Sequence, residues 1–400
     1  MLHFHSASVT IPDTAAAATA AIRQALAGAS AADCRLVVFH FTMGHEPDAA
    51  LRALRAEVPG ARVVGCSCAG VIGREGANES MRALALMAIT GDADEVTVTH
   101  CDGFTGETSR ARSTALARDL AARADGVRAA MLIAPGIDVD MDEAIAGIES
   151  VFGPEVPIFG GTASDNMKGI ATYQCVDDRV YEQGAFLVGF SDPTLSLESQ
   201  ATHGFVATGP EYTVTRATGH RVHEIDGQPA WRVYTAALGL PESAALGDTI
   251  PPGALGVKLS AELAAEYGDT HLLRAITHRE PDGTLLMPVG CPAGTRLSLM
   301  RRDEARIFAN LATMMAEITA RTGGRTPVAV FHTDCGARGR LMLDRVSKDE
   351  IVANMQRPLF GDACGPWLGM YGFGEITLLG GRNRFHNYTT SLYVLTRRPN

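Results

Sequence analysis

The sequence lacks a long uninterrupted apolar run. A membrane-spanning helix needs roughly 18 or more consecutive apolar residues, whereas the longest alanine-rich run, residues 14–27, contains Arg23 and Gln24. The first five residues, MLHFH, include no basic region of the kind that opens a secretory signal. We therefore expect a soluble, cytoplasmic protein with no membrane partner.

Cysteine is scarce, and its spacing excludes several classes of site. The 400 residues include eight cysteines and no Cys-x-x-Cys pair, which argues against zinc ribbons, redox dithiols and covalently attached haem. This density is far below that of a disulfide scaffold, so we expect reduced thiols. No group of histidines, cysteines and carboxylates has the spacing of a three- or four-ligand metal site, and no metal is predicted.

Long basic runs are also missing. The formal net charge is −10, with 35 Lys and Arg against 45 Asp and Glu. A nucleic-acid-binding protein needs a positive stripe that displaces counterions from phosphates, so no nucleic-acid partner is expected. The sequence contains no Gly-x-x-x-x-Gly-Lys, and residues 372–377, GFGEIT, lack the third glycine of a dinucleotide fingerprint.

What the sequence does contain is one pattern that recurs three times: strand, helix, second strand, Gly-rich loop and closing strand. In the first copy we expect strands at 36–41, 62–65 and 82–90 and a helix at 48–57. In the second copy we expect strands at 130–134, 157–159 and 185–190 and a helix at 142–152. In the third copy we expect strands at 328–332, 367–371 and 390–396 and a helix that ends at residue 356. The Gly-rich loops are expected at 66–73, 160–162 and 372–375. Strand–helix–strand crossovers make parallel neighbours. The sequence thus predicts an α/β fold of repeated β-α-β-β units that form mixed sheets.

A change in composition suggests two domains. Residues 239–241, GLP, and 250–253, IPPG, are turn signals that interrupt the pattern. We place the boundary near residue 240, within about ten residues, and expect domains at 1–240 and 241–400.

Unusual side chains follow the strand at 328–332. Residues 331–339, FHTDCGARG, place a thiol, a guanidinium and two glycines at the carboxyl end of a strand, where α/β sheets bind ligands. Arg338 could clamp a carboxylate or phosphate, or lower the pKa of Cys335; alternatively, Cys335 is buried and Arg338 lies on the surface. Glu375 and residues 382–388 are expected at the other loop of the same unit.

Several stretches together resemble the FIST family. Residues 64–73, 159–166 and 224–230 resemble its N-terminal half, and residues 335–339, 372–376 and 386–389 resemble its C-terminal half. The resemblance covers about residues 30–395 in the expected order, and it implies an intracellular sensory module that binds small ligands, with amino acids suggested. Family members signal to histidine kinases or cyclic-dinucleotide enzymes; some bind haem and sense nitric oxide, and others carry an F-box.

Our first hypothesis is a sensor for an amino-acid-like or other anionic or zwitterionic metabolite, signalling through a separate partner such as a histidine kinase or a cyclic-dinucleotide enzyme. No enzymatic activity or resident cofactor is required by this hypothesis, and an interface between domains is the favoured position for the site. The expected contacts are the charges of Arg338 and Glu375, the side chains of Asn387, Asp165 and Asn166, and the backbone amides of Gly160, Gly161 and Gly374.

Two alternatives remain open. A haem-bound nitric-oxide sensor needs an axial ligand and an apolar pocket, and the candidates are His332, His386, His40 and Cys291. A thiol enzyme or redox switch would use Cys335, which would need a base or a positive neighbour to activate it.

Overall fold

The computed structural model describes residues 1–341 and 343–398. Within these ranges the chain forms three six-stranded mixed sheets and one eight-stranded sheet, together with eight α-helices, so the predicted α/β fold of repeated units is confirmed. In the same ranges, no helix combines the length and the apolar character that crossing a membrane requires.

Each of the three units consists of a strand, a helix, a crossover strand, a second helix, a parallel strand and a closing strand. The first unit contains β1 (His3–Thr10), α1 (Thr14–Ala25), β2 (Cys34–Thr42), α2 (Pro47–Glu57), β3 (Arg62–Cys68) and β6 (Ala83–Thr90). The second contains β7 (Val96–Cys101), α3 (Ser109–Arg123), β8 (Ala129–Ala134), α4 (Met141–Phe152), β9 (Ile158–Thr162) and β12 (Ala185–Phe190). The third contains β13 (Leu195–Thr202), α7 (Glu304–Thr322), β22 (Ala329–Cys335), α8 (Arg345–Phe360), β23 (Trp367–Gly372) and β26 (Thr390–Arg397). The pairs β2–β3, β8–β9 and β22–β23 are parallel, as the crossovers predicted.

The three units exchange hairpins in a ring. The hairpin of β4 (Val71–Gly73) and β5 (Gly76–Asn78) pairs with β23 of the third unit, and that of β10 (Gln174–Val176) and β11 (Arg179–Tyr181) pairs with β3 of the first. The hairpin of β24 (Gly374–Leu379) and β25 (Arg382–His386) pairs with β9 of the second unit. Each sheet is therefore completed by a neighbouring unit.

The prediction that 66–73, 160–162 and 372–375 are loops is largely wrong, because most of these residues lie in β3, β4, β9, β23 and β24. Glycine is needed there for close strand approach: a Cβ atom on Gly161 would lie 2.0 Å from the carbonyl oxygen of Gly374. Gly160 has a φ of +104°, a conformation that glycine adopts without steric cost.

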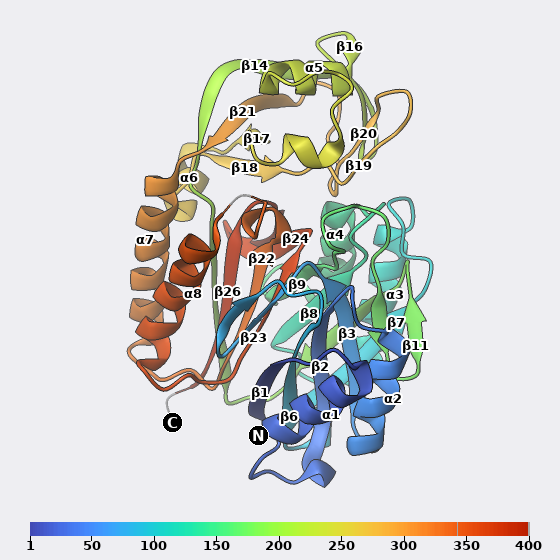
Figure 1. The fold of residues 1–400 in the computed structure, drawn as a ribbon, viewed down its shortest axis with the longest axis vertical. Coiled ribbons are helices and arrows are strands. Elements are labelled where there is room, and N and C mark those ends of the chain that lie inside the picture. The colour runs from blue at the N-terminus through green and yellow to red at the C-terminus, as the bar shows by residue number, and fades with distance from the viewer. Residues whose placement is uncertain (342, 399–400) are drawn as a thin grey trace.

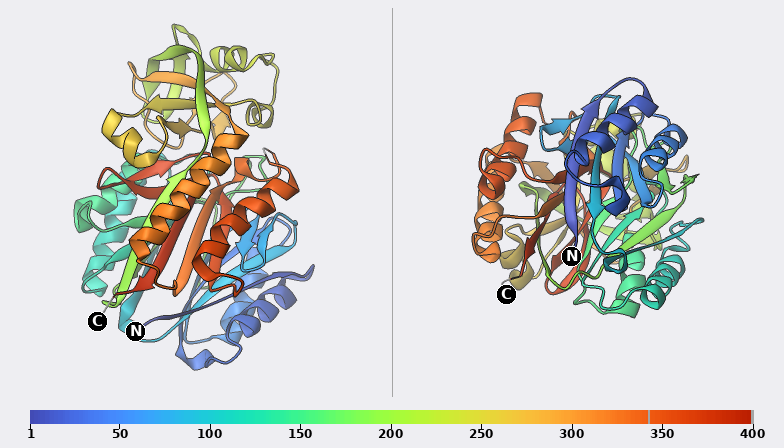
Figure 2. Two further views of the ribbon diagram at one scale, coloured as in Figure 1. Left: turned by 90° about the vertical axis from the view of Figure 1, so that its left-hand side faces the viewer. Right: turned by 90° about the horizontal axis from the view of Figure 1, so that it is seen from below.

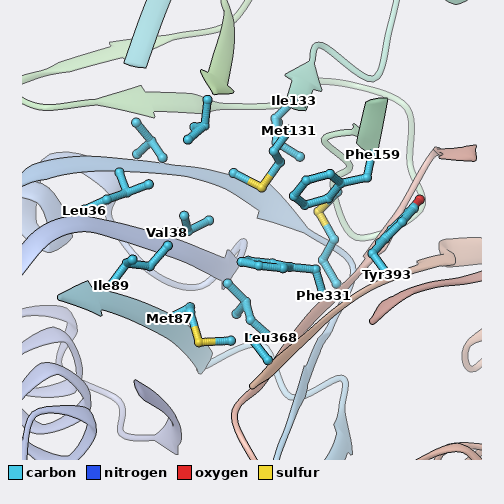
Figure 3. Packing of buried hydrophobic residues seen from close by; sticks show 14 of the residues in the cluster. Leu36, Val38, Met87, Ile89, Met131, Ile133, Phe159, Phe331, Leu368 and Tyr393 are labelled. Carbon is cyan, nitrogen blue, oxygen red and sulfur yellow. The ribbon is translucent and has the colours of Figure 1, made fainter. Parts of the chain in front are cut away.

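The three six-stranded sheets share one central core, with the helix pairs on their outer faces (Figure 2). Figure 3 shows Leu36 and Met87 from the first sheet, Phe159 from the second, and Phe331 and Tyr393 from the third packed together. The ring centroid of Phe159 lies 5.4 Å from that of Phe331 and 5.2 Å from that of Tyr393. The core thus joins all three units.

Residues 205–302 interrupt the third unit between β13 and α7 and form the eight-stranded sheet; we call them the insertion, and the other described residues the body. The insertion contains β14 (Phe205–Thr218), β15 (Arg221–Ile225), β16 (Gln228–Pro229), α5 (Ala230–Leu238), β17 (Ala254–Lys258), α6 (Ala261–Tyr267), β18 (His271–Arg274), β19 (His278–Arg279), β20 (Leu285–Leu286) and β21 (Arg296–Arg302). It sits at one end of the body (Figure 1).

The division of the chain at residue 240 stays a prediction. Residue 240 follows α5 within the insertion. The predicted domain 241–400 also includes residues 342, 399 and 400, which lie outside the described residues.

Candidate functional site

A cleft of about 540 Å³, a volume that includes open solvent at its mouth, lies between the insertion and the body. The insertion contributes Leu246, Gly247, Ile250, Ala275, Ile276 and Thr277, and the body contributes Met167, Lys168, Gly169, Cys335, Ala337, Phe373 and Tyr388. Clefts between structural units, with a mainly apolar lining and a few polar groups, are common positions for small-ligand sites. We treat this cleft as the candidate site.

One wall of the cleft is a loop built by Asp165. Its carboxylate accepts hydrogen bonds from the amides of Lys168 at 2.8 Å, Gly169 at 3.2 Å and Ile170 at 2.8 Å. These bonds fold the segment tightly enough that Met167 takes a left-handed φ of 68°. Asp165 is 2% exposed and does not line the cleft, so the structure gives it a positioning role.

The segment 386–389 joins the body to the insertion. Asn387 accepts a hydrogen bond from the amide of Ala275 at 3.1 Å and donates one to the carbonyl of Phe373 at 3.0 Å. Tyr388, held at a φ of 58°, forms part of the cleft wall, and its ring packs 5.5 Å from that of Phe205. The side chain of Asn387 therefore connects the insertion to the body next to the cleft.

Cys335 is the predicted site residue that lines the cleft itself. It is 3% exposed, and burial, followed by the nearby Glu375, raises the pKa of its thiol well above the usual value. A thiol activated for nucleophilic attack has a lowered pKa. The environment of Cys335 therefore favours the neutral thiol and gives no support to the thiol-enzyme alternative.

Arg338 lies beneath the cleft, and its side chain is 1% exposed. Its Nε donates to Asp334 at 2.8 Å, and a terminal nitrogen donates to the carbonyl of His203 at 3.2 Å. Burial raises the pKa of Asp334, but Arg338 and His332 outweigh that effect and the net pKa lies below the usual value. Both bonds of Arg338 are thus internal, and its role as a ligand clamp stays a prediction.

Glu375 is fully buried on β24. One carboxylate oxygen accepts from the hydroxyl of Thr389 at 2.6 Å and from its amide at 3.3 Å, whereas Oε1 has no partner. Burial raises the pKa of Glu375 well above its usual value, which favours the uncharged acid. Glu375 and Arg338 are therefore placed close to the cleft but outside its lining.

The remaining predicted contacts do not line the cleft either. Gly160 and Gly161 pair with Ile376 and Glu375, and Gly374 pairs with Thr162, so all three glycines belong to the β9–β24 ladder. The carbonyl of Asn166 accepts from Arg340 at 3.4 Å.

The four candidate haem ligands lie outside the lining of the cleft. His332, His386, His40 and Cys291 are all buried. His386 Nδ1 bonds the hydroxyl of Tyr267 at 3.1 Å, and its free Nε2 is enclosed by protein. Burial lowers the pKa of His386 and of His40 to about 3. As placed here, these side chains do not fit an axial role.

Sequence reasoning missed most of the cleft. Met167 and Lys168 follow the predicted contacts Asp165 and Asn166. Phe373 precedes the predicted Gly374, and Tyr388 follows the predicted Asn387. The signal was therefore within a residue or two of the right position. Residues 246–277, which form the insertion wall of the cleft, could not be identified in this way, because only the tertiary fold brings them next to the body.

Two domain profiles of one protein family match the sequence. The sequence profile of the FIST N domain matches residues 35–228, and that of the FIST C domain matches residues 230–377. The uncharacterized protein Rv0628c of Mycobacterium tuberculosis is 26% identical over 392 residues, covering 96% of this chain and 97% of that protein. The uncharacterized protein Mb0898c of Mycobacterium bovis is 26% identical over 243 residues, and the aligned part covers 60% of each chain.

Similarity to solved structures is weak. A cyanuric acid hydrolase from A. caulinodans aligns over the whole of both chains with 7% identity and a TM-score of 0.39, and T. maritima PurL in complex with FGAR gives a TM-score of 0.21. Scores this low carry no inference about activity. The two domain matches, in contrast, lie in the order that the sequence motifs predicted and together cover most of the chain. The chain belongs to the FIST family, whose domains are associated with signal-transduction sensing.

Proposed function

We propose that the protein is a sensor that binds a small ligand in the cleft and passes the signal to a separate partner protein. The observation that carries this proposal is that the insertion and the body each supply a wall of the cleft. A bound ligand would contact both and so change their relative position or rigidity. A histidine kinase or a cyclic-dinucleotide enzyme as the partner is inferred from the family resemblance alone.

The lining favours a small metabolite that has an apolar part and a negative charge. Ile250, Ile276 and Phe373 offer apolar surface, and Lys168 is the one charged residue among those that line the cleft in the described part of the chain. An amino-acid-like, anionic or zwitterionic ligand fits this pattern, with its carboxylate at Lys168 and its apolar part against the isoleucines. Neither haem binding nor thiol chemistry gains support from the positions of the histidines and Cys335.

Thermal-shift screening of the full chain with amino acids and small apolar carboxylates, followed by calorimetry on the hits, tests this proposal. Ile250→Asp places a negative charge on the cleft wall and should weaken binding of an anionic hit at least tenfold. Val346→Asp puts the same charge on α8 at a side chain that is 75% exposed, and should change the affinity less than twofold. Equal affinity of wild type and Ile250→Asp would remove the cleft as the site.

A further inference from the structure

The chain passes between body and insertion twice, and the two crossings lie side by side. It enters the insertion through Gly204 and leaves it through Asp303, whose amide donates to the Gly204 carbonyl at 3.1 Å. Gly204 has a φ of +87°, and a Cβ atom there would lie 2.6 Å from the backbone of Ile307. The close approach of the two crossings therefore depends on glycine at position 204.

Asp269, from the insertion, ties both crossings together. Its carboxylate is fully buried and accepts from the amides of His203 at 3.3 Å and Gly204 at 3.4 Å on the entering segment. It also accepts from Arg306 at 3.3 Å and Asn310 at 3.0 Å, both on α7 beyond the leaving segment. A buried carboxylate with this many donors forms a strong and localised junction.

On the opposite side of the interface, the amide of Met141 donates to the carbonyl of Pro288 at 2.7 Å, Val289 packs against the body, and Asp138 forms a more exposed set of ion pairs. Asp138, in the loop between β8 and α4, lies 3.0 Å from His220 Nε2 and 3.6 Å from the guanidinium of Arg221. Its side chain is 33% exposed, against a fully buried Asp269. Figure 1 shows the two sides of the interface: the crossings lie where β14 and β21 meet α7, and the start of α4 lies below β19 and β20. Asp138 precedes the start of α4, Met141, by three residues.

The cleft is connected to the crossings through η4 (Gly336–Arg338), a single 3-10 turn. Ala337 lines the cleft, and its neighbour Arg338 donates to the carbonyl of His203 at the entering segment. Cys335, on the same stretch, is 3% exposed and lines the cleft, one wall of which belongs to the insertion. Movement of the insertion would therefore change both the width of the cleft and the exposure of Cys335.

We propose that the insertion is a hinged lid over the cleft, pivoting at the two crossings beside Asp269 and fastened on the far side by the pairs of Asp138 with His220 and Arg221. Opening breaks the pairs of Asp138 and the Met141–Pro288 hydrogen bond, widens the cleft and exposes Cys335, while the bonds of Asp269 persist. Hinge closure about a few element-terminal residues is an established way in which a ligand site is gated. This proposal rests on the proposed function only in taking the cleft as the ligand site; the movement of the insertion itself does not require a ligand.

Asp138→Asn tests the lid on the ligand-free protein. Asn tolerates the left-handed φ of 51° at this position but removes the charge, so the backbone is retained while the pairs weaken. We expect alkylation of Cys335 by iodoacetamide, followed by peptide mass spectrometry, to become at least tenfold faster. Asp177→Asn is the matched control, because Asp177 also has a left-handed φ of 54° and pairs with an arginine, Arg62, but within the body; it should leave the rate unchanged.

Two further measurements distinguish a pivoting lid from a general loss of structure. Cys66 and Cys175, which are fully buried in the body, should keep their wild-type rates, and the Asp303 amide should keep its protection from hydrogen exchange. Arg221→Gln should accelerate Cys335 as Asp138→Asn does. Wild-type alkylation of Cys335 in both variants, or acceleration of all three cysteines together, would overturn the lid. A failed ligand screen would leave this result intact.

Discussion

At the scale of single residues, one buried carboxylate joins the first and the last strand of the body. Asp192 is 1% exposed and accepts from the amide of Leu2 at 2.8 Å, from the hydroxyl of Thr194 at 2.7 Å and from the guanidinium of Arg397 at 2.8 Å. Burial alone raises the pKa of Asp192, but these donors outweigh it and lower the pKa to about 2. Ionised Asp192 therefore stabilises the fold by holding β1 and β26 to the segment before β13.

Asp192→Asn should lower the free energy of unfolding by roughly 2 kcal/mol at pH 7, since one pKa unit corresponds to about 1.4 kcal/mol. A lowered pKa in the folded state gives stability that is complete above the unfolded pKa and is lost as the pH falls through the folded value. The difference between wild type and variant should thus shrink to roughly half by pH 3. Urea unfolding at both pH values measures it, with Asp178→Asn as an exposed control; a difference that is constant with pH would contradict the account.

Single residues also show what the sequence alone could not predict. The sequence predicted that Arg338, Glu375 and Asn387 lie at the loops of one unit, but it could not show that each has a partner within the protein, nor that Glu375 lies on β24 in the second sheet. Those partners, the carbonyl of His203, Thr389 and the amide of Ala275, include two from positions more than 100 residues away. A charged residue at a strand end is ambiguous until its long-range partner is known.

At the scale of elements, the fold depends on close contact between strands from different units. β9 and β24 pair through Gly161 and Glu375, and the second and third units meet there. A side chain at position 161 would push directly against the backbone of β24. Exchange of the β24–β25 hairpin is therefore possible only with glycine at this position.

Gly161→Ala should destabilise the protein by about 1–3 kcal/mol, the range typical of overpacking in a close-packed interior. Gly60→Ala is the matched control, because an added Cβ atom there meets nothing within 4 Å; it should stay within about 0.5 kcal/mol of wild type. Urea unfolding of both variants gives the comparison. Equal stability of Gly161→Ala and wild type would show that β9 and β24 can move apart at little cost.

The helices and the crossover strands could be predicted because their periodicity is local: 142–152 and 185–190 nearly match α4 and β12. The hairpins could not be assigned to their sheets, because β4, β10 and β24 each pair with a strand of another unit. The strand and helix that open each unit were also missed. Short glycine-containing segments look like loops when the partner strand is unknown.

At the scale of the whole molecule, the ring of exchanged hairpins links three units into one cooperative body. Each six-stranded sheet contains two strands from a neighbouring unit, and the shared core contains side chains from all three. The insertion, in contrast, is attached by two crossings, by polar contacts and by apolar packing in which Phe205, Leu273 and Met300 join side chains of the third unit. We therefore expect the body to be rigid and the insertion to move relative to it.

A fragment of residues 1–194, which contains the first two units, should not fold. It leaves the β4–β5 hairpin without β23 and β9 without β24, and it exposes Phe159, whose ring packs on Phe331 and Tyr393. We expect no cooperative urea transition by near-ultraviolet circular dichroism. A sharp transition in this fragment would show that a pair of units is self-sufficient.

A ligand site between the insertion and the body is tested most directly by a methyl NMR titration of the full chain labelled with ¹³C-methyl methionine. The titrant is a compound that raises the melting temperature of the protein. Met167 lines the cleft, whereas Met87 and Met131 lie in the shared core. The account predicts that the Met167 methyl resonance shifts in proportion to occupancy while those of Met87 and Met131 stay in place. A compound that binds and stabilises the protein but leaves Met167 unmoved would contradict a ligand site between the insertion and the body.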